Sequence, residues 1–396
     1  MASGKLQTLA YKYEMERNLR TKNYAGFVLL GLNDYSGQGT ALVGPLNVHW
    51  KEKGYVNSKE WTEFCNDVVP LARFPKFVYS SSDTLEVPIE VYNASSGNIV
   101  SPNVEYTIKD GDSILIQTSS PRMMSITHGK NKALGTVSFP LSQFVSPKKY
   151  TFEVAISSED RRWQNHWDFW VMPDESKEER VKGDVDRVKG KVDSKDIYIA
   201  DSLDTEAIAT LKAGGKVLLT AAGKVRYGND IKQQYLPVFW NTSWFKMRPP
   251  HITGAYVDSK HPVYRDFPTD DWTNLNWWEL VNRAQVMNLS EFPKDYQPPM
   301  QPIDTWHVSR KCGMIIEANV LGGRLLMTTI DITSRLNTRL VARQLRKSII
   351  NYMNSDAFKP AITVDESIIR NLYENEAKKV DMFTKDSPDE LKPKIK

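Results

Sequence analysis

Hydrophobic and polar residues change their spacing several times along this chain. In residues 1–73, apolar positions follow a helical spacing up to Arg20. A continuous apolar run from Phe27 to Leu32 predicts a strand, and a polar loop comes after it. A second helical stripe begins after Ser58, a plausible N-cap. A helix, a strand and a helix cannot form a sheet alone, so we expect this segment to belong to a larger fold.

Residues 74–173 follow a different period. In "TLEVPIEVYN" and "YTFEVAIS", apolar residues occupy every second position, as in a strand with one buried face. Turn-forming residues, as in "SSGN" and "KDGDS", separate the short runs. About seven such strands without a helical stretch are typical of an immunoglobulin-like β-sandwich.

The pattern changes again after the strands. Residues 174–192 are dense in charges of both signs, which indicates a linker or a solvated surface segment. Residues 193–358 predict strand, helix and strand, then two strands around the turn Leu321-Gly322-Gly323, and a last amphipathic helix. The strand–helix–strand order predicts a parallel sheet in an α/β domain. Residues 359–396 are charged and contain proline, so we expect a frayed tail.

Composition narrows the classes of partner. The chain has 396 residues, is 40% hydrophobic and carries a net charge of +4. Because basic and acidic residues nearly balance, the charge does not indicate nucleic acid or an anionic membrane as the partner. The sequence has no apolar run of membrane-spanning length, and its first residues do not resemble a signal peptide. These features leave the localisation of this chain open.

Few residues suit catalysis or metal binding. Cys65 and Cys312 are the only two cysteines, and neither lies on a strand-to-helix turn, which disfavours a thiol enzyme. The six histidines lack metal-ligand spacing, so we predict no metal and no cofactor. Glu14 and Glu16 are two positions apart on a predicted helix and would point to different faces. We interpret both as part of a solvated face rather than as a catalytic pair.

Two stretches could bind a ligand. The loop from Asn33 to Gly39 lacks the glycine and lysine spacing of a phosphate loop, so it is either a turn or part of another kind of site. Further along, "PVFWNTSWFKMRPPH" and "DDWTNLNWWEL" contain five tryptophans, among them Trp244 and Trp277. Tryptophan faces could stack on sugar rings, or the same residues could fill a core or an interface.

The chain resembles a known family over most of its length. "YAGFVLLGLNDYSGQGTALVGPLNVHWKEKGYV" and "EWTEFCNDVVPLARFPKFVYSSSDTLEVPIEVYN" resemble β-galactosidase-like family 2 glycoside hydrolases. "GNDIKQQYLPVFWNTSWF" and "RLVARQLRKSIINYMNSDAF" resemble a flavodoxin-like, amidotransferase-type domain found in some of these enzymes. The resemblance implies a multidomain fold, α/β plus all-β. It would consist of a partial (β/α)8 barrel in 1–73, an immunoglobulin-like sandwich in 74–173 and a flavodoxin-like α/β domain in 193–358.

The resemblance also implies a function. It implies retaining hydrolysis of glycosidic bonds, a galactoside-type or plant or host glycan as partner, and a bacterial periplasmic or extracellular parent enzyme. Asn33, Asp34 and Gln38 would lie at the rim of the sugar site, at the end of a barrel strand. Leu29 stands where some relatives have a sugar-contacting tryptophan, which weakens the case for galactose.

The catalytic part of that family is missing here. A complete barrel takes about 250 residues, and no residue of this chain matches either catalytic glutamate. We therefore predict no catalytic residue and no hydrolysis by the chain alone, with the N-terminal part of the enzyme as a possible partner. We also expect the run from Phe27 to Leu30 to be exposed. The alternative is a non-catalytic carbohydrate-binding or scaffolding protein that uses Trp244 and Trp277.

Overall fold

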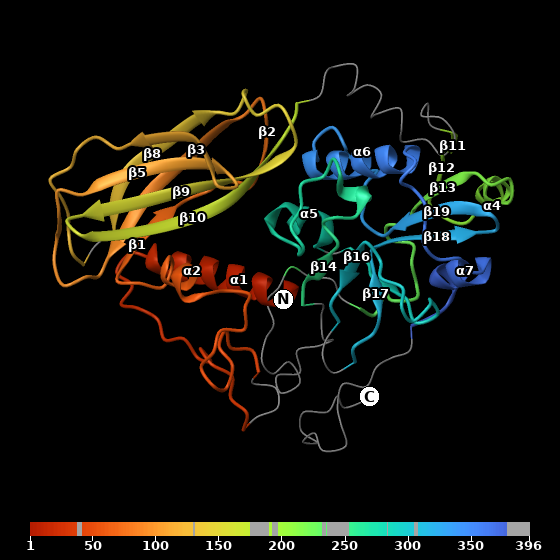
Figure 1. The fold of residues 1–396 in the computed structure, drawn as a ribbon, viewed down its shortest axis with the longest axis horizontal. Coiled ribbons are helices and arrows are strands. Elements are labelled where there is room, and N and C mark those ends of the chain that lie inside the picture. Colours follow the sequence, from red (N-terminus) through yellow and green to blue (C-terminus); the bar gives the residue numbers. More distant parts are fainter. Residues whose placement is uncertain are drawn as a thin grey trace. The chain divides into compact units, whose positions relative to one another are not determined.

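The chain forms two compact units, Ser3–Asp174 and Glu175–Lys396, here called the N-terminal and C-terminal units (Figure 1). The computed structural model describes residues 1–37, 42–129, 131–174, 190–191, 197–231, 235, 253–282, 284–304 and 308–377. Of these residues 20% are helical and 32% lie in strands. The predicted fold class is therefore wrong, because the described part is mostly β-sheet and contains no barrel.

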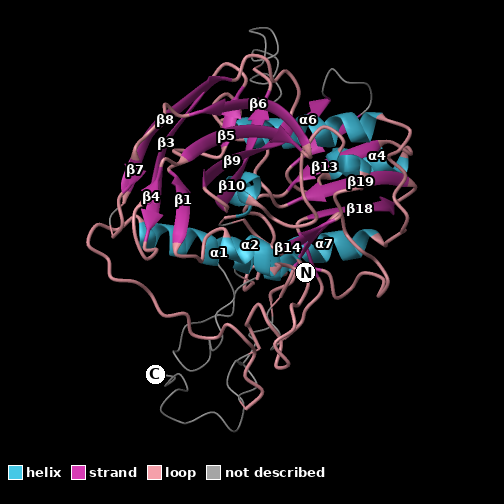
Figure 2. Cartoon of the chain, turned by 60° about the vertical axis from the view of Figure 1, so that its left-hand side comes forward, coloured by secondary structure: helices cyan, strands magenta, loops and turns pink. Residues whose placement is uncertain are grey.

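The N-terminal unit is built mainly from two sheets that share one core (Figure 2). One sheet has the order β1-β3-β8, the other β2-β10-β9-β5-β6, and β4 pairs with β7. Its elements are α1 (Ala2–Leu19), α2 (Ser58–Thr62), β1 (Val68–Ala72), β2 (Val78–Ser80), β3 (Thr84–Asn93), β4 (Ile99–Val100), β5 (Asn103–Asp110), β6 (Ser113–Ser119), β7 (Ser125–Ile126), β8 (Lys132–Pro140), β9 (Lys148–Ser158) and β10 (Arg161–Met172).

The alternation predicted for β3 and β9 is confirmed. Every second residue of β3, from Leu85 to Val91, is fully buried. On β9, Phe152 and Val154 are buried in the same core. Each strand thus removes one apolar face from water, which is the main favourable contribution to folding of such sheets.

The first 73 residues differ from the barrel remnant that the resemblance implied. The helix predicted up to Arg20 is confirmed as α1, but no strand forms between Phe27 and Leu32. Val28 and Leu30 are 97% and 83% exposed, as expected. The expectation is wrong for Phe27 and Leu29, which are partly buried, and Phe27 packs against the cluster of Leu19, Val69 and Leu71. The second predicted helix is short: α2 ends early and the chain continues as β1, which pairs with β3. These residues therefore complete the two-sheet unit rather than the end of a barrel.

The C-terminal unit has a seven-stranded sheet, ordered β11-β12-β13-β19-β18-β16-β14. Helices α4 and α7 share a core cluster with this sheet, and α6 packs against η1 (Figure 1). The elements are β11 (Gly190–Lys191), β12 (Ile197–Ala200), α4 (Thr205–Lys212), β13 (Lys216–Thr220), β14 (Ala255–Val257), η1 (Pro262–Tyr264), η2 (Leu275–Trp277), α5 (Trp278–Val281), β15 (Met287–Asn288), β16 (Met300–Pro302), β17 (Cys312–Gly313), β18 (Ile315–Val320), β19 (Gly323–Thr328), α6 (Leu340–Asn354) and α7 (Glu366–Glu374).

This sheet is mixed, which contradicts the flavodoxin-like prediction. Strands β12, β13 and β19 are parallel, whereas β18, β16 and β14 pair antiparallel. The reversal occurs at Leu321 and Gly322, which both have positive φ and form the two-residue turn between β18 and β19. A doubly wound sheet would need a helical crossover at this point.

Two smaller predictions concern the charged segments. The frayed tail is wrong for residues 366–374, because α7 buries Ile369 and Leu372 there and Asp365 caps its first turn. The predicted linker falls mostly outside the described residues; within it, residues 190–191 form β11.

Candidate functional site

A partly polar cavity lies in the C-terminal unit, at the carboxyl ends of the parallel strands β13 and β19. We call this cavity, of about 670 Å³, the strand-end pocket. Gly223 enters it just after β13, and Thr329 and Asp331 enter it just after β19. Open sheets with parallel strands usually bind ligands at this edge, because the loops that follow the strands converge there. Position alone therefore makes this cavity a candidate binding site.

One wall of the strand-end pocket is an ion-pair network centred on Arg339. Its guanidinium contacts the Glu279 carboxylate and donates to Asp331 Oδ2 at 3.0 Å. Burial raises the pKa of Asp331, but hydrogen bonds from Ser334 and Thr333 and the charge of Arg339 together place this pKa below its ordinary value. Through these two ion pairs Arg339 joins α5 to the loop after β19.

Two other side chains remain available to a ligand. Arg335 and Asn282 line the pocket, and neither side chain has a hydrogen-bond partner among the described residues. Arg335 has a φ of 49°, a left-handed conformation that is costly for a residue with a Cβ. Its carbonyl accepts from the Thr338 and Arg339 amides at 3.1 and 3.2 Å, which holds the loop in this shape.

Of the two tryptophans predicted to stack on a sugar, Trp277 is not accessible to a ligand. Trp277 is fully buried: its Nε1 donates to Thr269 Oγ1 at 2.8 Å and its ring meets Phe267 edge-on at 4.9 Å. Its neighbour Trp278 is 52% exposed. Trp278 lies one helical turn before Asn282, so the two share one face of α5. Trp278 does not itself line the pocket, but it begins the helix α5, from which Glu279 and Leu280 line it. Trp244 falls outside the described residues.

The predicted loop site is held largely by its own contacts. Asp34 is buried, and its Oδ1 accepts from Gly44 N at 3.0 Å and from Lys53 Nζ at 2.7 Å. Asn33 Nδ2 donates to Asp34 O at 3.1 Å. A Cβ at position 44 would lie 2.6 Å from the Asn33 carbonyl carbon, so glycine is required for this closure. Gln38 lies outside the described residues.

A buried polar network joins α1 to β10 in the N-terminal unit. Glu16 is fully buried and accepts from Lys12 at 2.7 Å, Arg20 at 3.0 Å and Trp167 Nε1 at 3.1 Å. The solvated face predicted for this residue is therefore wrong, although Glu14 is exposed. Sequence spacing could not reveal this role, because the partner on β10 is 151 residues away.

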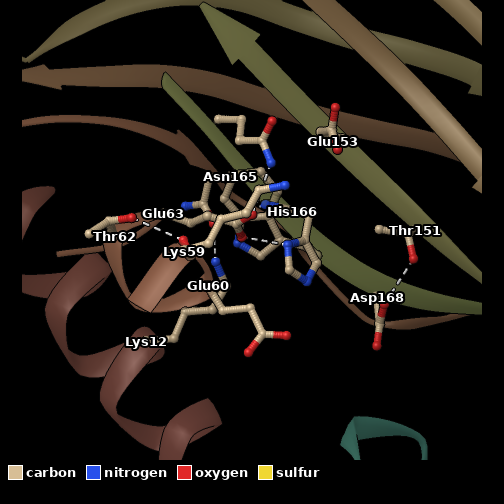
Figure 3. Close-up of polar contacts among 12 residues, drawn as sticks. Lys12, Lys59, Glu60, Thr62, Glu63, Thr151, Glu153, Asn165, His166 and Asp168 are labelled. Atoms are coloured by element: carbon tan, nitrogen blue, oxygen red, sulfur yellow. Dashed lines mark hydrogen bonds and ion pairs between the residues drawn. The ribbon is translucent and has the colours of Figure 1, made fainter. Parts of the chain in front are cut away.

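Beside this network, Glu63 pairs with His166. Figure 3 shows the two side chains pointing toward each other, with Glu63 Oε2 at 2.5 Å from His166 Nδ1. Burial raises the pKa of Glu63, but its hydrogen bond with His166, the nearby charges and Gln164 bring the pKa below its ordinary value. The contact anchors the chain after α2 to β10. Asn165 on the same strand donates to Glu16 at 2.9 Å and so anchors α1 instead.

The cysteines do not have the environment of a nucleophile. Burial raises the pKa of the Cys312 thiol to about 12, the opposite of what an activated thiolate requires. Burial also raises the pKa of Cys65. Across the described ranges, no cluster of histidine, cysteine, aspartate and glutamate is arranged to hold a metal ion. The helices in those ranges are also too short or too polar to cross a membrane.

Comparisons with known proteins assign no function. Residues 198–374 match a family described as "Domain of unknown function (DUF8487)", and residues 83–173 match "Domain of unknown function (DUF8488)". No curated protein matches the chain.

Similar solved structures are remote. The CARDB domain of PF1109 from Pyrococcus furiosus is 16% identical, covers 27% of this chain and 94% of its own, and has a TM-score of 0.22. The sporulation control protein Spo0M from Bacillus subtilis is 9% identical, covers 31% of this chain and 54% of its own, and has a TM-score of 0.23. Scores this low support no inference about the present chain.

Proposed function

We propose that this chain binds a neutral carbohydrate at the strand-end pocket and does not hydrolyse it. The observation that carries the proposal is a pocket at the carboxyl ends of parallel strands that is lined by the available side chains of Asn282 and Arg335. The exposed indole of Trp278 lies on α5, the helix that contributes to this lining. Indole faces stack on the apolar faces of sugar rings, while Asn282 and Arg335 can hydrogen-bond ring hydroxyls. A mostly preformed cavity with a few convergent polar groups is the usual form of a small-molecule site.

The arrangement of carboxylates supports binding rather than catalysis. A retaining glycosidase needs two carboxyl groups about 5–5.5 Å apart, one as acid and one as nucleophile. In the strand-end pocket, Glu279 and Asp331 both pair with Arg339. An ionised aspartate held by a guanidinium and several donors is a poor general acid. The resemblance to family 2 glycoside hydrolases favours a glycan as the ligand and leaves the sugar open.

Affinity electrophoresis in galactan and related glycans tests this proposal. We expect retardation of the purified chain, and at least about fivefold weaker binding for Trp278→Ala, since losing a ring contact costs roughly 1 kcal/mol. Trp50→Ala removes an indole that is 64% exposed in the other unit and is the matched control. Equal retardation of Trp278→Ala and the parent chain would contradict the proposed site.

A second candidate follows from the exposed apolar residues of the N-terminal unit. Val28, Leu30 and Trp50 are exposed in one irregular segment, and exposed apolar patches usually mark a contact surface. We infer that this segment contacts the catalytic part of a family 2 glycosidase and places Asn33, Asp34 and Gln38 near the sugar, without forming a strand of its barrel. The purified chain should then not hydrolyse nitrophenyl β-galactoside, whereas the change equivalent to Asp34→Ala should weaken turnover in a full-length relative. Turnover by this chain alone, abolished by Asp34→Asn, would overturn the assignment.

A further inference from the structure

A second cavity, of about 380 Å³, lies in the N-terminal unit beside the C-terminal end of α1. We call it the arginine pocket. It is lined mainly by three arginines and three aromatic residues: Tyr13, Arg17, Arg20, Arg73, Phe74 and Phe77. These residues come from α1 and from the segment between β1 and β2, so two elements distant in sequence form the cavity. No aspartate or glutamate lines it.

The charges around the arginine pocket are not balanced. Arg20 shares the buried Glu16 carboxylate with Lys12, so one negative charge offsets two positive charges. Arg73 pairs with Glu90. Arg17 is exposed and has no ion-pair partner among the described residues. The cavity therefore carries an excess of positive charge from Arg17 and from the Arg20 cluster.

Arg20 also has hydrogen-bonding capacity left. Its Nη2 donates to Glu16 Oε2 and to the Ala72 carbonyl, at 3.0 and 2.5 Å. Its Nε is buried and has no hydrogen-bond partner in the part of the chain that the structure describes. A buried donor without a partner is costly, and an acceptor on a bound ligand would relieve that cost.

An aromatic surface adjoins these charges. The rings of Phe74 and Phe77 are stacked, with centroids 5.5 Å apart, and Tyr13 meets Phe77 edge-on at 5.6 Å. Phe74 and Phe77 are only partly buried, so part of this surface faces the cavity. A ligand that fits the pocket would therefore place an anionic group at the guanidinium groups and an apolar ring face on the aromatic residues.

We propose that the arginine pocket binds an acidic sugar, in which a carboxylate or sulfate group is carried on a pyranose ring. Guanidinium groups bind such oxyanions through paired hydrogen bonds, and the ring of the sugar would lie on Phe77 or Tyr13. A neutral sugar lacks the charge that Arg17 and Arg20 would balance. This site lies in the other unit from the strand-end pocket and does not depend on the function proposed there.

Calorimetric titration of the full chain with galacturonate tests the proposal. The titrations use the Trp278→Ala background, which removes the exposed indole on the helix beside the strand-end pocket, and the parent chain is titrated once for comparison. We expect galacturonate to bind at least about tenfold more tightly than galactose, because a charge-assisted hydrogen bond exceeds a neutral one by about that factor. Galactose 6-sulfate in place of galacturonate shows whether a sulfate also satisfies the site.

Substitutions then locate the binding. Arg17→Gln should weaken galacturonate binding by roughly tenfold and Phe77→Leu by several-fold. Arg122→Gln is the control: it removes an exposed arginine of the same unit that does not line the cavity. It should leave the affinity for galacturonate unchanged.

Four results would overturn the proposal. The first is no difference between galacturonate and galactose. The second is unchanged galacturonate binding in Arg17→Gln. The third is inorganic sulfate binding as tightly as galacturonate, which would show that the aromatic surface contributes nothing. Loss of galacturonate binding only in Trp278→Ala, compared with the parent chain, would place the acidic sugar in the strand-end pocket and likewise contradict the arginine pocket.

Discussion

The strand-end pocket and the arginine pocket both contain arginines, but they hold them differently. In the strand-end pocket, Arg339 is matched by two carboxylates that line the same cavity. In the arginine pocket, the acids that pair with the arginines lie behind the wall, and one of them, Glu16, is fully buried. The two carboxylates of the strand-end pocket also offset the charge of the unpaired Arg335, so that two acids stand beside two arginines in one cavity. In the arginine pocket no acid lines the cavity, so its arginines remain available to an anion. The difference separates a pocket suited to neutral ligands from one suited to anionic ligands.

The largest expected effect concerns Glu16. Glu16→Ala should lower the free energy of unfolding of the N-terminal unit by about 3–5 kcal/mol, because Lys12 and Arg20 would lose the carboxylate that compensates them in a buried place. Urea denaturation followed by tryptophan fluorescence measures this loss. Glu14→Ala, two positions away and exposed, should stay within about 0.5 kcal/mol of the parent chain. If Glu16→Ala and Glu14→Ala lowered the free energy of unfolding by similar amounts, the polar network around Glu16 would not be buried.

The neighbouring tryptophans of the C-terminal unit should separate stability from binding. Trp277→Ala should lower the free energy of unfolding by about 3–5 kcal/mol, as expected for removing a fully buried indole. Trp278→Ala should change stability little and weaken sugar binding. Thermal unfolding and affinity electrophoresis of the same two proteins test both halves. A destabilised Trp278→Ala would indicate that this indole packs rather than binds.

Breaking the ion pairs of the strand-end pocket should cost far less than removing Glu16. The side chains of Asp331 and Glu279 are 39% and 36% exposed, so water can solvate them once Arg339 is gone. Arg339→Ala should therefore lower the free energy of unfolding by only about 1 kcal/mol, as is usual for partly exposed ion pairs. Chemical denaturation compares this variant with Arg343→Ala one turn further along. A loss as large as that of Glu16→Ala would remove the contrast between the two pockets.

The smallest expected effect is a response to acid. The pKa of Glu63 is lowered in the folded chain from its ordinary value of 4.5. A lowered carboxyl pKa contributes stability that is complete above 4.5 and is lost as the pH falls through the folded value. Stability measured from pH 6 to pH 3 should decline in this window, and less so in Glu63→Gln. An identical pH profile in that variant would assign the decline to other carboxyls, such as Asp331.

Sequence patterns identified many elements but not how they associate. The alternation in β3, the stripe of α6 and the hairpin at Leu321 follow from local periodicity and turn chemistry, and they appear where predicted. The apolar run at Phe27 satisfies the same rules and still forms no strand. A strand needs a partner edge to satisfy its backbone groups, and no periodicity states whether that edge exists.

The sequence by itself determined the periods of the strands and helices, the near balance of charge and the presence of a tryptophan-rich segment. Only the tertiary structure decided that Glu16 is buried, that Trp278 rather than Trp277 is accessible, and that β16 and β14 extend the sheet antiparallel beyond β18. The physical reason is the range of the interactions. Periodicity reports which face of an element is apolar, whereas burial of a charge or exposure of one indole depends on residues that lie many positions away in the chain.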